Sequence, residues 1–270
     1  GTVVVIAGSR RYCGAPRLAA LASARAGAGL VTLAVPECIY RMVAGSVMEP
    51  IFAPLPDDGE GFAGGSSEQL IDALEGSDVV LAGPGWGQSL ERARFLAELL
   101  SLASGSSARL GLDADGLNLL AQREGWWREL PRQTILTPHP GEMARLADCS
   151  VAEVQRDRVA SAHEAASRWG CTVVLKGAFT VIADPDVGEV LVPFANPALA
   201  SGGTGDVLPG AIAGLWAQQD NRYTAALCGA YLHGLAGEML RERLGEAGLL
   251  AGDLLGTLPV ARATLAQPQS

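Results

Sequence analysis

The feature that most constrains this chain is a repeated alternation between short apolar runs and longer amphipathic stretches. The apolar runs are rich in Val, Ile and Leu and are bounded by Gly or Pro, as expected for strands buried on both faces. Strands are predicted at Thr2–Ala7, Leu30–Val35, Asp78–Ala82, Arg109–Asp113, Thr134–Thr137 and Thr172–Leu175. Helices are predicted near residues 14–27, 66–75, 88–102, 116–122, 141–147 and 151–169. This alternation implies a parallel sheet with right-handed crossovers and helices on both faces.

The later part of the chain follows a different pattern. Phe179–Ala183 and Glu189–Pro193 alternate and flank Asp184-Pro185-Asp186, which predicts an antiparallel hairpin at the edge of the sheet. The rest is expected to be mostly helical, most clearly over Ala211–Gln218 and Ala225–Leu244. The expected fold class is therefore α/β, with a mostly parallel central sheet and an antiparallel edge hairpin.

The composition excludes several classes of protein. With 270 residues, 49% hydrophobic and 18% charged, the chain can bury a large core, so it is not expected to be disordered. Its net charge of −9 would repel a phosphate backbone, which argues against a nucleic-acid partner. No apolar run reaches the ~18 residues of a membrane span. Because no linker or repeat is seen, we expect a single domain over residues 1–270, with a disordered tail after about Ala266.

The cysteines and the first residues bear on the compartment. Five Cys occur, none in a C-x-x-C pair, which favours a reducing, cytoplasmic location without a disulfide framework or a zinc knuckle. Gly1–Ile6 is interpreted as a strand and not as a signal peptide, because it lacks a basic region and a cleavage site. It also lacks an initiator Met, so we expect a processed piece or one domain of a longer protein.

Glycine and polar residues cluster where the predicted strands end. The clusters include GS, GPG, HPG, KG and GGTG. Since ligands bind beyond the carboxyl ends of the strands in open parallel sheets, this coincidence predicts one site formed by several turns.

The sharpest cluster is Ala200-Ser201-Gly202-Gly203-Thr204-Gly205-Asp206, which precedes an apolar helix predicted from Val207. Consecutive Gly residues let backbone N–H groups point into one concavity, and the start of the helix adds a positive dipole end. The pattern predicts a phosphate site, although it is not a Walker A loop. Two interpretations of Asp206 remain open: an acid that complements the helix dipole, or a general base beside a phosphoryl acceptor.

Two further turns carry ionisable side chains. Lys176 is the only lysine in the chain and precedes Gly177 after a buried strand. It is either an exposed edge residue or a point charge for a nucleotide phosphate. His139 lies between two prolines ahead of Gly141 and Glu142, where it either stiffens a strand-to-helix turn or binds a ligand.

Three weaker signals complete the set. Asp113 and Asp115, two residues apart after a strand, either share a hydrated Mg²⁺ or cap a helix. The turn at residues 83–87 is glycine-rich, and Gly8-Ser9 leads into a helix of small residues. Small residues at such spacing more often indicate tight helix packing than ligand contact.

The motifs together resemble one family. GPGWG, LDADGLN, TPHPGEMARL, VVLKGAFTVIA and NPALASGGTGDVLPGAIAGL occur in the order seen in the ADP-dependent NAD(P)H-hydrate dehydratases. The resemblance covers nearly the whole chain, as far as the Tyr231-Leu232-His233-Gly234 helix. This family is ribokinase-like, which implies a three-layer α/β/α sandwich. It repairs hydrated NADH or NADPH: ADP phosphorylates the ring hydroxyl, and loss of phosphate restores the dihydronicotinamide and leaves AMP.

The resemblance implies a role for each matching residue. Asp206 matches the acid that activates the hydroxyl. The adenine nucleotide is assigned Lys176, Gly177, Ala178, Phe179, Thr180, Gly203, Thr204 and Gly205. The hydrated dinucleotide is assigned Ala15, Gly85, His139 and Asp206, with Asp113, Asp115, Asn118, Glu142 and Asn196 in supporting places. Mg²⁺ is implied as a cofactor bound through phosphates and water, with no direct protein ligand. The implied partners are these small molecules, other copies of the chain in a homo-oligomer such as a tetramer, and an NAD(P)H-hydrate epimerase.

The chain departs from the family pattern at one turn of the site. Phe194-Ala195-Asn196-Pro197 stands where the family usually has Thr-Gly-Asn-Pro, so a hydroxyl and a Gly are lost. Upstream, the family's N-terminal helix and the epimerase domain sometimes fused ahead of it are missing from this sequence. Two alternatives remain: a kinase of the same superfamily acting on a hydroxyethylthiazole- or hydroxymethylpyrimidine-type alcohol, and a non-catalytic nucleotide sensor.

Overall fold

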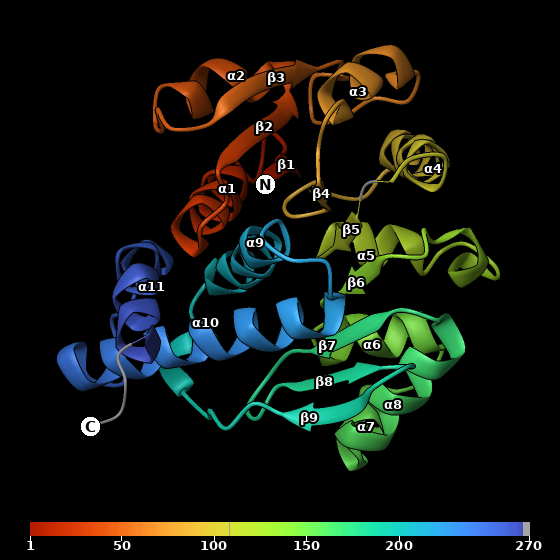
Figure 1. Cartoon of the computed structure of the whole chain (residues 1–270). Coiled ribbons are helices and arrows are strands. Elements are labelled where there is room, and N and C mark those ends of the chain that lie inside the picture. The colour runs from red at the N-terminus through yellow and green to blue at the C-terminus, as the bar shows by residue number, and fades with distance from the viewer. Residues whose placement is uncertain (108, 267–270) are drawn as a thin grey trace.

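A computed structural model of the chain describes residues 1–107 and 109–266 and is built on one nine-stranded sheet. The strands are β1 Thr2–Ile6, β2 Leu30–Pro36, β3 Ile51–Leu55, β4 Val79–Ala82, β5 Arg109–Leu112, β6 Thr134–Leu136, β7 Thr172–Leu175, β8 Val181–Asp184 and β9 Gly188–Leu191. Their order across the sheet is β3-β2-β1-β4-β5-β6-β7-β8-β9 (Figure 1). All pairings from β3 to β7 are parallel, while β8 pairs antiparallel with β7 and β9. The predicted edge hairpin is therefore confirmed.

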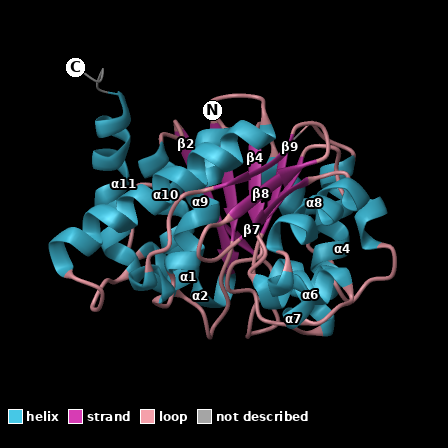
Figure 2. Ribbon diagram, turned by 90° about the horizontal axis from the view of Figure 1, so that it is seen from below, coloured by secondary structure: helices cyan, strands magenta, loops and turns pink. Residues whose placement is uncertain are grey.

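Helices cover both faces of the sheet (Figure 2). They are α1 Gly14–Ala26, α2 Glu37–Ala44, α3 Ser67–Leu74, α4 Leu90–Ser104, α5 Asp115–Leu120, α6 Pro140–Ala147, α7 Val151–Arg156, α8 Arg158–Trp169, α9 Thr204–Trp216, α10 Arg222–Leu244 and α11 Ala251–Ala266. Short 3₁₀ turns span Trp126–Glu129 and Pro197–Ala200. The expected three-layer α/β/α arrangement is confirmed.

The core follows from the alternation of side chains along the strands. In β1, Val3 and Val5 face the layer of α1, α2, α9 and α10, and Val4 and Ile6 face the layer of α3, α4, α5, α6 and α8. Both sets are buried, because a central strand packs against helices on each side. A further cluster joins α11 to α1, α9 and α10 on the outside of the first layer.

The strand order reverses between β1 and β4. The chain runs from β1 through β2 to β3 on one side, and returns to β4 on the other side of β1. In open sheets, the carboxyl ends of two such strands leave a crevice in which ligands bind. The turns after β1 and β4 meet there, where the Gly8 amide donates to the Pro84 carbonyl at 2.8 Å.

Several predicted boundaries were wrong for local reasons. The helix predicted over 151–169 is two helices, because Asp157 is extended (φ −147°, ψ 90°) and its side chain accepts from the Ala160 amide at 2.9 Å, which caps α8. The helix predicted from Val207 begins at Thr204. Strand β3 and helix α2 were not predicted. The tail predicted to be disordered after Ala266 lies outside the described residues.

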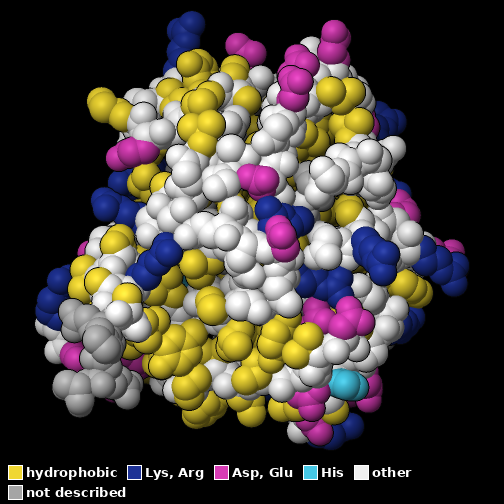
Figure 3. All heavy atoms as spheres, in the orientation of Figure 1, with side chains coloured by type: hydrophobic (Ala, Val, Ile, Leu, Met, Phe, Trp, Pro, Cys, Tyr) yellow, Lys and Arg dark blue, Asp and Glu magenta, His cyan; other side chains and the backbone are white. Residues whose placement is uncertain are grey.

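Hydrophobic side chains gather in more than one part of the face shown in Figure 3. Hydrophobic side chains gather on its lower part, near β8, β9 and α10. Leu191, the last residue of β9, and Val187, which immediately precedes the strand, are both exposed. No helix within residues 1–107 and 109–266 has the length and apolarity required to cross a membrane.

Candidate active site

The start of α9 is shaped by its glycines. Gly203 is the N-cap residue at φ +85°, a left-handed conformation, and an added Cβ would lie 2.8 Å from Leu18 Cδ1. The hydroxyl of Thr204 donates to the Leu199 and Ser201 carbonyls at 2.6 and 2.8 Å, so Thr204 anchors the turn. No side chain caps this helix. The Asp206 amide donates to the Gly203 carbonyl at 3.0 Å. The phosphate site expected at this helix end stays a prediction.

Asp206 lies in the first turn of α9 and is half-buried. Within the described part of the chain, its carboxylate makes no hydrogen bond or ion pair. Burial raises the pKa of Asp206 to about 7; the negative charge of Asp113 adds to the rise, and Lys176 opposes it. An unpaired carboxylate with this pKa can accept a proton from a bound hydroxyl near neutral pH.

Lys176 forms a buried ion pair at the ends of β5, β6 and β7. Its Nζ lies 2.6 Å from Asp113 Oδ1 and 3.8 Å from Glu142 Oε2. The Lys176 side chain is 15% exposed and that of Asp113 only 1%. Thr137 Oγ1 also donates to Asp113 Oδ1, at 2.7 Å. The interpretation of Lys176 as an exposed edge residue was therefore wrong.

The charges of this array compete with burial. Burial alone would lower the pKa of Lys176, but Asp113 and Glu142 together raise it, so the amine stays protonated. Burial raises the pKa of Glu142 to about 7 against the opposing charge of Lys176. Asp206 also acts on Lys176 electrostatically. The four groups therefore form one electrostatic unit at the carboxyl edge of the sheet.

His139 has a definite local role. Its Nδ1 accepts from the amides of Gly141 and Glu142 at 2.9 and 3.4 Å, and Glu142 Oε2 accepts from the His139 amide at 2.8 Å, which completes a capping box on α6. The interpretation as a stiff strand-to-helix turn is confirmed. Burial lowers the pKa of His139, helped by the positive charges of Lys176 and Arg145. Its side chain is half-exposed, and ligand contact by the ring remains a prediction.

Asp113 and Asp115 do not converge on a common point. Asp113 pairs with Lys176. Asp115 instead accepts a hydrogen bond from the Gly87 amide at 2.8 Å, which links α5 to the turn after β4. Neither carboxylate caps a helix, since the N-cap of α5 is Ala114 and makes no side-chain hydrogen bond. Asn118 accepts from Arg145 at 2.8 Å. Across residues 1–107 and 109–266, no group of three or more His, Cys, Asp or Glu side chains could hold a metal ion.

Ala15 and Gly85 meet where the turns after β1 and β4 come together. Gly85 has φ +67°, and a Cβ there would lie 2.9 Å from Ala15 Cβ and 2.8 Å from Tyr12 Cβ. Gly85 therefore lets the turn after β4 close onto the start of α1. These two residues, 70 positions apart in the sequence, lie together; that they face the hydrated dinucleotide stays a prediction.

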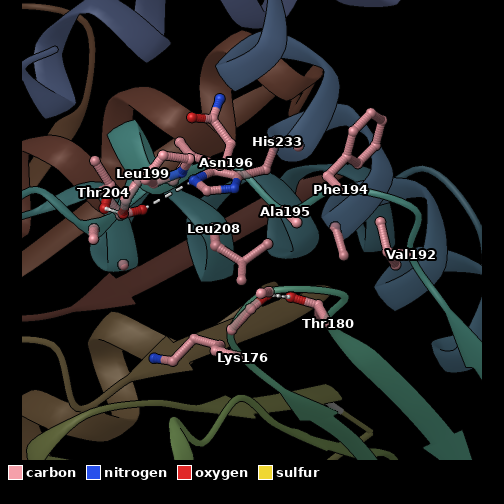
Figure 4. A pocket seen from close by; sticks show the side chains of 17 residues that line it. Lys176, Thr180, Val192, Phe194, Ala195, Asn196, Leu199, Thr204, Leu208 and His233 are labelled. Atoms are coloured by element: carbon pink, nitrogen blue, oxygen red, sulfur yellow. Dashed lines mark hydrogen bonds between the residues drawn. The ribbon is translucent and has the colours of Figure 1, made fainter. Parts of the chain in front are cut away.

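A cavity of about 430 Å³ opens beside Lys176 and the start of α9 (Figure 4). Of the residues predicted to bind the nucleotide, Lys176, Gly177, Ala178, Thr180, Thr204 and Gly205 line it, together with Asn196. Phe179 and Gly203 do not line it. Phe179 is exposed at φ +52°, and its amide donates to the Phe194 carbonyl at 2.8 Å. Sequence reasoning missed Val192, Phe194, Leu199, Leu208, Ala230, His233 and Gly234. Most of these lie in segments that carry the family resemblance or depart from it, but no spacing within those segments indicates which side chains face a cavity; Val192 and Ala230 lie in no such segment.

Comparisons with known proteins agree with this geometry. A family profile described as NAD(P)H-hydrate dehydratase matches residues 3–260. The bifunctional NAD(P)H-hydrate repair enzymes of Moorella thermoacetica and Escherichia coli are 40% and 36% identical to the chain over 96% of its length, which corresponds to 48% and 47% of theirs. The chain thus spans about half the length of these curated relatives.

Solved structures give the same result. An ADP/ATP-dependent NAD(P)H-hydrate dehydratase from Bacillus subtilis, co-crystallised with ATP and Mg²⁺, superposes with a TM-score of 0.82 at 31% identity, covering 98% of this chain and 89% of that one. A hydroxyethylthiazole kinase from Pyrococcus horikoshii reaches a TM-score of 0.66 at 15% identity over 96% of this chain and 87% of its own, which shows a shared fold alone. On the profile match and these identities, the chain belongs to the NAD(P)H-hydrate dehydratase family.

Proposed function

We propose that this chain catalyses the ADP-dependent dehydration of hydrated NADH or NADPH, in the S form, to the dihydronicotinamide, with AMP and phosphate as the other products. The observation that carries the proposal is the unpaired carboxylate of Asp206. It lies at the start of α9 beside the cavity, within electrostatic range of Asp115, which is bonded to the turn after β4. A base in this place can reach an acceptor held in the β1–β4 crevice and a phosphoryl group held at the helix end.

The chemistry proceeds in two steps. Asp206 takes the proton of the ring hydroxyl while that oxygen bonds to the β-phosphorus of ADP, and the bond from this phosphorus to the bridging oxygen breaks, releasing AMP. The ring C–O bond then breaks with phosphate as leaving group, and the adjacent ring carbon loses a proton to restore the double bond. Amide groups at Gly203–Gly205 would offset the charge on the transferred phosphoryl group. The water removed from the substrate thus appears in the phosphate.

Magnesium is proposed to enter with the nucleotide. The described residues offer no carboxylate cluster for it, and Asp113 is already paired with Lys176. Mg²⁺ bound by the phosphates and water would neutralise phosphate charge, and no step is assigned to a metal held by the protein. The Bacillus subtilis dehydratase was co-crystallised with ATP and Mg²⁺, which supports this arrangement.

Two partners are also proposed. The exposed hydrophobic residues near β9 support assembly into a homo-oligomer, such as a tetramer. The curated relatives are bifunctional repair enzymes about twice as long as this chain, which supports a working partnership with an NAD(P)H-hydrate epimerase.

The test is to incubate the protein with ADP, Mg²⁺ and hydrated NADH and to follow the recovery of dihydronicotinamide absorbance. Asp206→Asn should lower kcat by about 10²-fold or more, because a positioned base is lost. Asp253→Asn is the matched control, since Asp253 also lies in the first turn of a helix, α11. Turnover of a simple alcohol with ATP, without recovery of the hydrate, would instead indicate the related kinase. Equal small effects of the two substitutions would reduce Asp206 to an acid that complements the helix dipole.

A further inference from the structure

The cavity beside α9 has a polar end and an apolar end. Lys176 and Thr204 lie at one end, next to the helix N-terminus, and Val192 and Phe194 lie at the other (Figure 4). A nucleoside diphosphate with its phosphates at the helix end would place its base against Val192 and Phe194. Its ribose would then lie between the two ends.

His233 lies between these two ends, and one of its ring nitrogens has no hydrogen-bond partner among the described residues. His233 is buried, with an exposed fraction of 8%, and its Nε2 lies 3.0 Å from the Thr204 carbonyl oxygen. A carbonyl only accepts hydrogen bonds, so Nε2 carries the proton and donates. Burial lowers the pKa of His233 to about 4, so the ring is neutral at pH 7 and Nδ1 is an acceptor. Within residues 1–107 and 109–266, nothing donates to Nδ1.

The aromatic ring of Phe194 is fixed as a wall of the cavity. It contacts Tyr231 edge-to-face, with ring centroids 5.1 Å apart and planes at 61°. It also lies directly over Gly234, where an added Cβ would overlap the ring. Hydrogen bonds at both sides of its backbone hold the turn: its amide donates to Val192 and its carbonyl accepts from Phe179, both at 2.8 Å. A ring held in this way offers a rigid stacking surface.

We propose that His233 and Phe194 make this cavity selective for a purine ribonucleotide, with His233 Nδ1 accepting a hydrogen bond from a ribose hydroxyl and Phe194 covering the base. The proposal rests on the proposed function in assigning the cavity to ADP. The exocyclic amine of adenine is another donor that Nδ1 could accept from. The ribose is favoured, because His233 is bonded to Thr204 at the phosphate end and does not lie at the end with Phe194.

The test measures binding alone, by calorimetry with Mg²⁺ and no dinucleotide. The probes are ADP, 2′-deoxy-ADP, 3′-deoxy-ADP, inosine diphosphate and cytidine diphosphate. One deoxy analogue should bind about 10-fold more weakly than ADP, since it lacks the hydroxyl that donates to Nδ1. Inosine diphosphate, which lacks the amine, should bind about as well as ADP.

Two substitutions separate the two nitrogens of His233. In His233→Gln the side-chain amide can still donate to Thr204, but the acceptor at the Nδ1 position is lost, so the preference for ADP over the deoxy analogue should disappear. In His233→Asn an oxygen replaces Nδ1, so the preference should persist. The control is His163→Gln, because His163 is an exposed histidine on α8 and contacts Glu189. Phe194→Leu should reduce the preference for ADP over cytidine diphosphate and leave ribose selectivity unchanged.

The outcomes are distinct from those of the dehydration assay. Equal affinity of the wild-type protein for ADP and both deoxy analogues, or no binding of ADP, would overturn the role of His233. Weak binding of inosine diphosphate with no ribose preference would assign Nδ1 to the adenine amine instead and also overturn it. If ribose selectivity is found but hydrated NADH is not repaired, the proposed function fails and the inference about the nucleotide stands.

Discussion

Replacing Lys176 by Met removes the only cation of a buried array and should cost about 3–5 kcal/mol of the free energy of unfolding. The pair is close, at 2.6 Å between Nζ and Asp113 Oδ1, and the Asp113 side chain is 1% exposed. Without Lys176, Asp113 keeps the Thr137 hydroxyl as a partner but loses its ion-pair partner, and Glu142 keeps only the charge of Arg145 and the bond from the His139 amide. Most of the cost therefore comes from carboxylates left charged in a site of low polarity.

The assay is urea unfolding of wild type, Lys176→Met, Asp113→Asn and the double variant at pH 8 and pH 5. The double variant should be less destabilised than the sum of the single variants, because the second substitution removes the charge that the first leaves unpaired. Burial already raises the pKa of Glu142 to about 7 in the wild type, and in Lys176→Met the pKa rises further because the charge that opposes burial is lost. A carboxyl with a raised folded-state pKa contributes stability below its unfolded pKa and loses it as the pH rises, so the deficit should be smaller at pH 5 than at pH 8.

A cost below about 1 kcal/mol, equal at both pH values, would refute this reasoning and would match an exposed ion pair. Additive single effects would lead to the same conclusion. Since Lys176 also lines the cavity, ADP affinity should fall in the same variant, and the unfolding data separate this effect from the loss of stability.

Three further predictions concern the acid and the two halves of the site. Because the pKa of Asp206 is raised to about 7 and the base must be ionised, kcat/KM should fall as the pH drops below 7, and this inflection should vanish in Asp206→Asn. Gly85→Ala should raise KM for the hydrated dinucleotide and leave KM for ADP unchanged; Gly87→Ala, at a similar φ of +74° but with open space around it, tests strain without the clash. Gly234→Ala should displace the Phe194 ring and weaken ADP binding, whereas Gly252→Ala, which meets nothing, should not. Calorimetric titration with ADP checks the last pair.

Local pattern was sufficient to predict most of the sheet. The strands at Thr2–Ile6 and Thr172–Leu175 are short, apolar and bounded, so the buried-strand pattern identified them directly. Strand β3 escaped because its residues, Ile51–Leu55, contain a Pro and only Leu55 is fully buried, as expected at the edge of a sheet. The break at Asp157 escaped because a single Asp in a helical pattern signals an N-cap only once the backbone is seen to leave the helix there.

The sequence predicted that the candidate site lies at the carboxyl ends of the strands, but it did not predict which charged side chains form ion pairs there. Every functional cluster was placed at a strand end, and the parallel sheet then brought the clusters to one edge. The spacing between Asp113 and Asp115 suggested a shared ion, whereas the partner of Asp113 is Lys176, 63 residues away. Which carboxylate meets the single lysine depends on how β5 and β7 are placed across the sheet, and no short-range pattern contains that information.

At the Phe194 turn, the hydroxyl and the glycine missing from the family pattern are replaced by packing of an aromatic ring. In the family pattern this turn usually has Thr-Gly, so Phe194-Ala195 removes a hydroxyl and a flexible residue. In the fold the Phe194 ring fills the space above Gly234 and contacts Tyr231, both on α10. A large residue is tolerated in the turn only because a residue without a side chain faces it on the helix. The end of the cavity beside α9 therefore follows from the motifs that carry the family resemblance, while the end at Phe194 depends on two residues, Phe194 and Gly234, that must be matched to each other in this chain.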